Sequence, residues 1–324
     1  MHTTVYSQQS LSQSDATIMI DDFVSKVLST TGLAYKNRSD SAERGNGRLQ
    51  SYRLFLPAML NVFDGRVAYD FSEPLKLFNE TRQEIRLVAT GAHFTCPDPD
   101  DRDRYLSERE CFNLLIKRIR KNGQDGRYAR KLGDRAHDVG IQSYELREYV
   151  SAVMEVYPQT LVVRGTLRYP SALKTWFRVG DVFADRHRLL NLIASPPIFS
   201  GLAGYTLRIE QTEMWGFSIQ TVFFFNAATI KSEACHALQL AEVLSAMSDK
   251  SGYWDNIGQD LTGWHEAQGR TTGLFDREET AAILRMAKAM TGLGRVNRSL
   301  RVMPERALPI FTRTWPSNQN DQAA

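Results

Sequence analysis

The chain has 324 residues, of which 42% are hydrophobic and 10% aromatic, and its formal net charge is +3. This length suggests one or two domains with enough apolar residues for a buried core. The small positive charge is no argument for nucleic acid by itself, and no apolar run reaches the roughly 20 residues of a membrane span, so we expect no membrane partner.

The N-terminal part of the sequence predicts a tail followed by helices. Residues 1–16 are polar and predict a disordered tail, and residues 17–143 predict a mainly helical N-terminal region. Its expected elements are helices over 18–29, 52–63, 74–78 and 107–121, with a short strand over 84–90.

A run of basic residues begins at the end of the helix expected over 107–121. It comprises Lys117, Arg118, Arg120, Lys121, Arg127, Arg130, Lys131 and Arg135. Cations near a helix C-terminus offset the helix dipole, which favours a solvated helix end. The run is longer than capping requires, so a nucleic-acid contact is the second interpretation.

The three cysteines, Cys96, Cys111 and Cys235, are isolated in the sequence and odd in number. No CxxC pair occurs, so we expect neither a zinc ribbon nor a disulfide framework. The polar N-terminus also lacks a signal-peptide core. Together these features predict a cytoplasmic location, where thiols stay reduced.

The second half predicts an α+β domain over residues 144–316, with a disordered tail over 317–324. Its expected elements in chain order are a helix over 144–156, a strand over 161–169, helical residues 171–193, a hairpin with strands 205–210 and 217–226, and helices over 231–247 and 277–290. Residues 249–273 predict loops. We expect an antiparallel sheet with the helices on one face.

The hairpin over 204–226, GYTLRIEQTEMWGFSIQTVFFFN, is the most informative segment. Side chains alternate across a strand, so each strand has an apolar face and a more polar one. If the apolar faces are covered by helices, the opposite faces bring six side chains together: Arg164, Arg168, Arg208, Glu210, Ser218 and Gln220. We expect any chemistry to lie there.

Residues 157–316 resemble the replication-initiator-like domain of filamentous phages and prophages, the inovirus gene-two-like group that includes the YagK/YfjJ C-terminal domain. The likeness rests on LVVRGTLRY (161–169), on the hairpin and on TRTWP (312–316). The resemblance implies a Rep-like palm, the scaffold of the rolling-circle HUH nicking enzymes.

The resemblance also implies a degenerate catalytic site. In the family, two histidines on alternate residues of the second hairpin strand bind a divalent metal, and a helix-borne tyrosine attacks the phosphate. The matching positions are Ser218 and Gln220, which are weak ligands, and Arg285, which replaces the tyrosine in RMAK (285–288). Glu210 matches the acidic metal ligand and Lys288 the family lysine. We therefore expect no catalytic residue and no cofactor, with Mg²⁺ or Mn²⁺ bound only if the site is active.

Three functional hypotheses follow from the sequence. The first is a DNA-binding protein of phage, prophage or mobile-element origin with nicking lost, its expected phosphate contacts being Arg164, Arg168, Arg208, Arg285, Lys288 and Arg313. The second is an active nicking-joining endonuclease with ligands elsewhere, for example His236 or His265. The third is a structural or protein-interaction role in which the N-terminal 140 residues bind a partner, such as a phage or host replication protein.

Overall fold

The computed structural model divides the chain into two compact units. The first unit comprises residues 1–135, 175–177 and 301–305, and the second comprises the rest. The division falls within a long helix, α6 (Gly126–Met154), rather than at the expected boundary after residue 143. The structure describes residues 11–35, 46–63, 68–101, 103–194, 197–249, 252–256, 271–291, 300–304 and 311–313.

The first unit is mainly helical, as the sequence predicts. Its elements are α1 (Gln13–Ser29), α2 (Gly47–Gln50), η1 (Ser51–Phe55), α3 (Leu56–Asn61), β1 (Tyr69–Phe71), α4 (Glu73–Glu84), β2 (Val88–Thr90), β3 (His93–Thr95), α5 (Glu108–Gly123) and β9 (Val302–Pro304). Phe23 of α1 stacks on Phe112 of α5 with ring centroids 5.5 Å apart, and its ring also meets Phe78 of α4. These buried rings pack α1, α4 and α5 together in the hydrophobic core of the first unit.

Two short antiparallel strand pairs complete the first unit. β9 pairs antiparallel with β1, so the late segment 302–304 belongs to the same unit as the N-terminal helices. Arg301 supports this pairing because its Nε donates to Asp21 Oδ2 at 2.7 Å. β2 and β3 form a second antiparallel pair.

The expected disordered tail over 1–16 was wrong for its last residues. Helix α1 begins at Gln13, and the Asp15 amide donates to the Ser12 hydroxyl at 3.0 Å. Ser12, Gln13 and Ser14 are buried. The polar residues of this segment include Ser12, which is the N-cap of α1. Its hydroxyl accepts a hydrogen bond from a backbone amide that has no partner within the first helical turn. Residues 1–10 and the expected tail over 317–324 lie outside the described residues.

The basic run lies on α5 and on the start of α6. Arg118 forms an ion pair with Glu84 at 3.2 Å, and Lys131 forms one with Glu73 at 3.5 Å. Arg120 instead donates to the carbonyl oxygen of Val27 at 3.0 Å. These partners favour the solvated helix end over a nucleic-acid contact, because part of the charge is already neutralised within the first unit.

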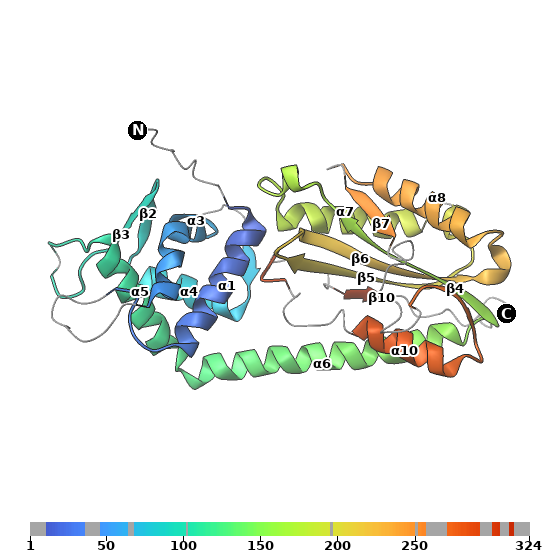
Figure 1. Cartoon of the computed structure of the whole chain (residues 1–324), viewed down its shortest axis with the longest axis horizontal. Coiled ribbons are helices and arrows are strands. Elements are labelled where there is room, and N and C mark those ends of the chain that lie inside the picture. Colours follow the sequence, from blue (N-terminus) through green and yellow to red (C-terminus); the bar gives the residue numbers. More distant parts are fainter. Residues whose placement is uncertain are drawn as a thin grey trace. The chain divides into compact units, whose positions relative to one another are not determined.

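The second unit contains the sheet that the hairpin predicts (Figure 1). Besides the C-terminal part of α6, its elements are β4 (Gln159–Arg168), η2 (Ser171–Leu173), α7 (Val179–Ile193), η3 (Pro197–Phe199), β5 (Leu202–Thr212), β6 (Gly216–Asn226), η4 (Ala227–Thr229), α8 (Glu233–Ala246), β7 (Tyr253–Asn256), β8 (Gly273–Asp276), α10 (Thr280–Thr291) and β10 (Phe311–Arg313). The strands follow the order β10-β5-β6-β4-β7, with β8 also paired to β4, and every pairing is antiparallel.

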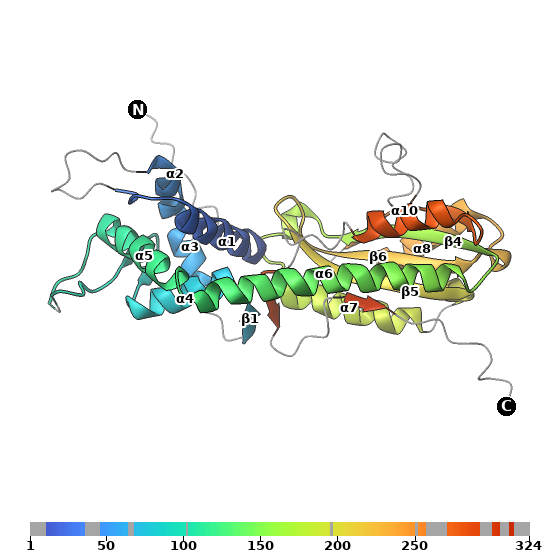
Figure 2. The ribbon, with the colours of Figure 1, turned by 90° about the horizontal axis from the view of Figure 1, so that it is seen from below.

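Helices cover both faces of this sheet, so the expectation of helices on one face was wrong. Val222 and Phe224 of β6 pack with α6 and α10, which run alongside each other in Figure 2. The alternate residues Phe223 and Phe225 point to the other face, where the Phe225 ring meets His236 of α8 with centroids 4.5 Å apart. Consecutive apolar residues require cover on both sides of a strand. The α+β class and the antiparallel hairpin are confirmed.

Gly165 of β4 lies beneath the indole ring of Trp254. A Cβ at this position would lie 2.2 Å from the Trp254 ring and 2.7 Å from the Asp255 carbonyl oxygen. The ring is held in place because its Nε1 donates to Thr221 Oγ1 at 2.9 Å. The strand therefore accepts only glycine here without displacement of β7.

Gly165→Ala is expected to lower the free energy of unfolding by about 1–3 kcal/mol, the usual cost of overpacking a core. Urea unfolding of the full chain measures the loss. Gly180→Ala in α7 is the matched control, because nothing lies within 4 Å of its added methyl group. Equal stability of the two variants would contradict the assigned packing of Trp254 on β4.

Candidate nucleic-acid interface

The sheet register brings the predicted polar side chains onto one face. Glu210 of β5 lies opposite Ser218 of β6, and Arg208 lies opposite Gln220. Gln220 in turn lies opposite Thr166 of β4. Because directly paired residues share a face, and alternate residues of one strand do too, Arg164 and Arg168 of β4 belong to the same set. The convergence predicted from alternation alone is confirmed.

Glu210 and Gln220 form the centre of this polar face. The Gln220 amide Nε2 donates to Glu210 Oε2 at 2.7 Å. Glu210 is 2% exposed and Ser218 is 4% exposed, so both lie inside the unit rather than on its surface. The hydrogen bond between Gln220 and Glu210 is therefore a structural contact inside the unit. The side-chain amide of Gln220 and the hydroxyl of Ser218 are weak metal ligands.

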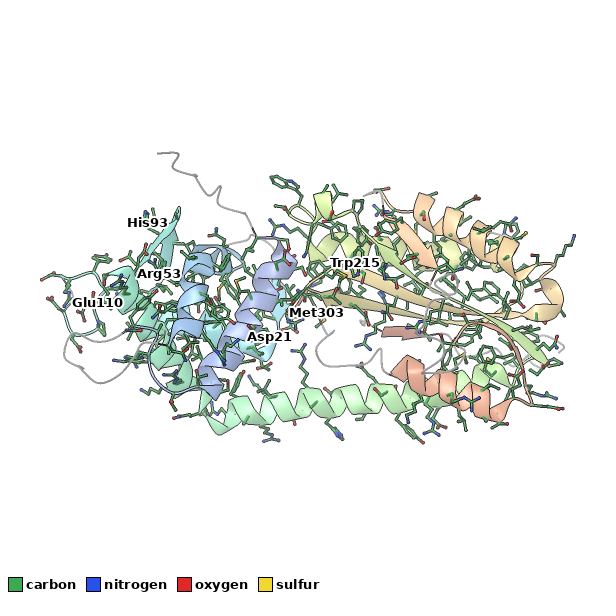
Figure 3. The ribbon with its side chains drawn as sticks, viewed as in Figure 1. Asp21, Arg53, His93, Glu110, Trp215 and Met303 are labelled. Atoms are coloured by element: carbon green, nitrogen blue, oxygen red, sulfur yellow. The ribbon has the colours of Figure 1, made fainter. Side chains whose placement is uncertain are left out.

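Arg168 has local partners that the sequence did not reveal. Its guanidinium forms an ion pair with Asp255 of β7 and lies over the Trp215 ring, 4.4 Å from its centroid (Figure 3). Asp255 falls in the segment expected to be loop, so sequence reasoning missed it. Arg164 and Arg208 are half-buried on the same face.

A second group of cations lies on the helices that cover the same face. Arg285 and Lys288 of α10 are exposed and line a groove of about 520 Å³ with Arg147 and Tyr144 of α6. Tyr144 is 65% exposed. Sequence reasoning missed Arg147 and Tyr144, although their i, i+3 spacing places them on one side of a helix.

The other residues predicted to bind DNA or a metal ion lie away from Glu210 or outside the described residues. Arg313 pairs with Thr206 in the sheet through β10. His236 is buried against Phe225, on the face opposite Gln220, and burial lowers its pKa. His265 lies outside the described residues. Within the part of the chain that the structure describes, no group of three or more His, Cys, Asp or Glu side chains is arranged to hold a metal ion.

The chain was compared with protein-family models, with curated proteins and with solved structures. None of the three comparisons found a match. The described helices include none that is long and apolar enough to cross a membrane. The likeness to the phage and prophage initiators therefore stays a prediction.

Proposed function

We propose that this chain is a DNA-binding protein of phage, prophage or mobile-element origin, built on a scaffold related to rolling-circle replication initiators, with nicking lost. One observation carries the proposal. The register of β4, β5 and β6 gathers Arg164, Arg168 and Arg208 on a single sheet face. Guanidinium groups that share one face suit the phosphates of a nucleic-acid backbone.

The groove between α6 and α10 supports the same function. It adds Arg147, Arg285 and Lys288 on the helices that pack against that sheet face. Binding of phosphates to such cations releases counterions from DNA, so the affinity falls with salt concentration. The DNA would lie across this side of the second unit.

The loss of nicking is supported by the chemistry at three positions. In the resemblance to the initiators, Ser218 and Gln220 match the metal-binding histidines, and the Gln220 amide is hydrogen-bonded to Glu210. Arg285 matches the nucleophilic tyrosine, and a guanidinium cannot attack phosphorus. The chain would therefore bind a catalytic metal ion weakly and would lack the nucleophile at this position.

A second candidate, an active nicking-joining endonuclease, is favoured by one observation. The exposed phenol of Tyr144 lies in the groove with Arg285 and Lys288. Nearby cations stabilise the negative charge that develops on a phosphate under attack. Tyr144 is thus the residue on which a covalent adduct would be sought first.

Fluorescence anisotropy of labelled DNA with the full chain tests the proposal. We expect the logarithm of the binding constant to fall linearly with the logarithm of the salt concentration. Supercoiled plasmid incubated with the protein and Mg²⁺ or Mn²⁺ is expected to stay intact, with no covalent adduct. Absent binding would remove the proposal and favour a protein-interaction role. A metal-dependent nick abolished by Tyr144→Phe would favour the second candidate.

A further inference from the structure

Cys96 and Cys111 face each other inside the first unit. Their sulfur atoms lie 3.2 Å apart, and both residues are fully buried. Cys96 follows strand β3 directly, and Cys111 lies in the first turns of α5. This pairing could not be read from the sequence, because the two residues are not arranged as a CxxC motif.

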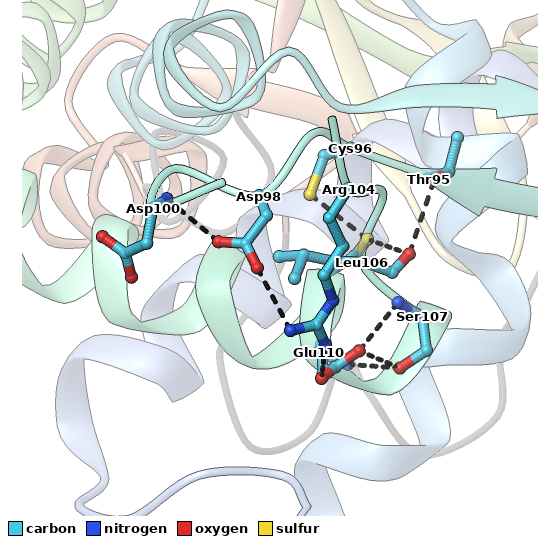
Figure 4. A network of polar contacts seen from close by, with 9 residues as sticks. Thr95, Cys96, Asp98, Asp100, Arg104, Leu106, Ser107 and Glu110 are labelled. Atoms are coloured by element: carbon cyan, nitrogen blue, oxygen red, sulfur yellow. Dashed lines mark hydrogen bonds and ion pairs between the residues drawn. The ribbon is translucent and has the colours of Figure 1, made fainter. Parts of the chain in front are cut away.

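The connecting segment is held at both ends, which keeps the two sulfurs together. The Leu106 amide donates to the Cys96 carbonyl oxygen at 3.0 Å, and the Leu106 carbonyl accepts from Cys111 Sγ at 3.4 Å. Ser107 and Glu110 form a capping box that fixes the start of α5. Arg104 adds an ion pair to Glu110 at 2.7 Å (Figure 4). These contacts hold the two thiols close together before any reaction.

The two thiols differ in character. The Cys96 thiol donates to Cys111 Sγ, which lowers the pKa of Cys111 and raises the pKa of Cys96. Cys111 also lies near the N-terminus of α5, where the helix dipole favours a thiolate. One sulfur is thus suited to attack an oxidant, and the other to supply the second sulfur of a disulfide.

We propose that Cys96 and Cys111 form a reversible oxidation site, at which a hydroperoxide converts the two thiols to an intramolecular disulfide. The sulfurs need to approach by only about 1.2 Å to reach the disulfide bond length of about 2.05 Å. Cys235 is exposed on α8 of the second unit and is not part of the site.

The reaction proceeds in two balanced steps. The Cys111 thiolate attacks one oxygen of the hydroperoxide, so that an S–O bond forms, the O–O bond breaks and an alcohol or water leaves after protonation. The Cys96 sulfur then attacks the Cys111 sulfenic acid; the S–S bond forms, the S–O bond breaks, and the hydroxide leaves as water with the Cys96 proton. The thiols lose two electrons, which the hydroperoxide gains.

The disulfide would lock the segment between β3 and α5. It closes a covalent loop from residue 96 to residue 111, which restricts the unfolded chain more than the folded one. The oxidised first unit is therefore expected to unfold at a higher temperature than the reduced one. A thiol reductant reverses both the bond and the shift.

The test uses the full chain carrying Cys235→Ser, so that only the paired thiols remain. Hydrogen peroxide is added, and free thiols and intact mass are followed. We expect both thiols to disappear together, the mass to fall by two hydrogen atoms, and a proteolytic digest to contain Cys96 linked to Cys111. Dithiothreitol restores both thiols. The same reaction in urea is expected to be slower, because unfolding separates the sulfurs.

A further variant gives the second measurement. In Cys96→Ser combined with Cys235→Ser, a hydroxyl can still donate to Cys111 Sγ, and we expect Cys111 to accumulate as a sulfenic acid that dimedone captures. Two free thiols in Cys235→Ser after a peroxide dose that oxidises Cys235 in the unmodified chain would overturn the proposal. Cross-linking only in urea, or separate sulfinic acids without a cross-link, would overturn it as well.

Discussion

Replacing Arg164 and Arg208 together with alanine is expected to weaken DNA binding about a hundredfold at moderate salt. A hydrogen bond to a charged group contributes about 1.5 kcal/mol, which is roughly tenfold in affinity for each lost contact. The register places Arg164 and Arg208 on the same sheet face through the intervening strand β6.

The salt dependence gives the sharper readout. Each lost phosphate contact removes about 0.7–0.9 from the slope of log K against log salt, so the double variant should flatten the slope by about 1.4–1.8. Fluorescence anisotropy at several salt concentrations measures this. The effect should be the same for DNA of different sequence, because phosphate contacts carry no base information.

A matched control removes the same charge from elsewhere in the second unit. Lys231 and Arg277 are both exposed and lie outside the polar sheet face, so Lys231→Ala with Arg277→Ala should change the slope little. Arg168→Ala is measured separately, since its side chain also holds Asp255 and Trp215 and its loss alters packing as well as charge. An equal slope for the test and control variants would identify Arg164 and Arg208 as structural residues.

The hairpin of the sheet could be predicted because the pattern that indicates it lies within one short segment of the sequence. Alternation in β5 and β6 assigns each side chain to a face without knowledge of any partner, and the two strands join through a short turn. The convergence of Arg208, Glu210 and Gln220 followed from this pattern alone. The four consecutive apolar residues Val222 to Phe225 also indicate that helices cover both faces of the sheet. The prediction of helices on one face did not take this run into account.

The rest of the site depends on contacts between distant residues. The ion pair of Arg168 with Asp255 and the packing of Gly165 under Trp254 both require β7 to lie beside β4. β7 has four residues and no strong alternation, so the sequence offered no signal for it. The thiol pair depends in the same way on the return of the chain from β3 to α5.

A buried carboxylate in the second unit shows the same limit. Asp185 of α7 is fully buried and accepts hydrogen bonds from the hydroxyls of Tyr169, at 2.9 Å, and Ser248, at 2.7 Å. Arg188 forms an ion pair with it, and also with Asp249. Burial, and then the nearby Asp185 charge, raises the pKa of Tyr169 well above its usual range. Asp185 thus ties α7 to the ends of β4 and α8.

Asp185→Ala is expected to lower the free energy of unfolding by about 3 kcal/mol. The Tyr169 and Ser248 hydroxyls would lose their acceptor, and each buried unsatisfied donor costs about 1–3 kcal/mol. Urea unfolding of the full chain, followed by circular dichroism, measures the loss. Tyr169→Phe should cost only about 1 kcal/mol, because it removes one donor and leaves the carboxylate with its other partners.

Asp249→Ala is the matched control, because it removes a different carboxylate from the same Arg188. Asp249 is 67% exposed, and an exposed ion pair contributes at most about 1 kcal/mol. Asp185→Ala should therefore be the more destabilising variant by a clear margin. If the two aspartate variants unfold at the same urea concentration, Asp185 does not hold α7 and β4 together, and the hydrogen bonds assigned to Tyr169 and Ser248 carry little of the stability of the second unit.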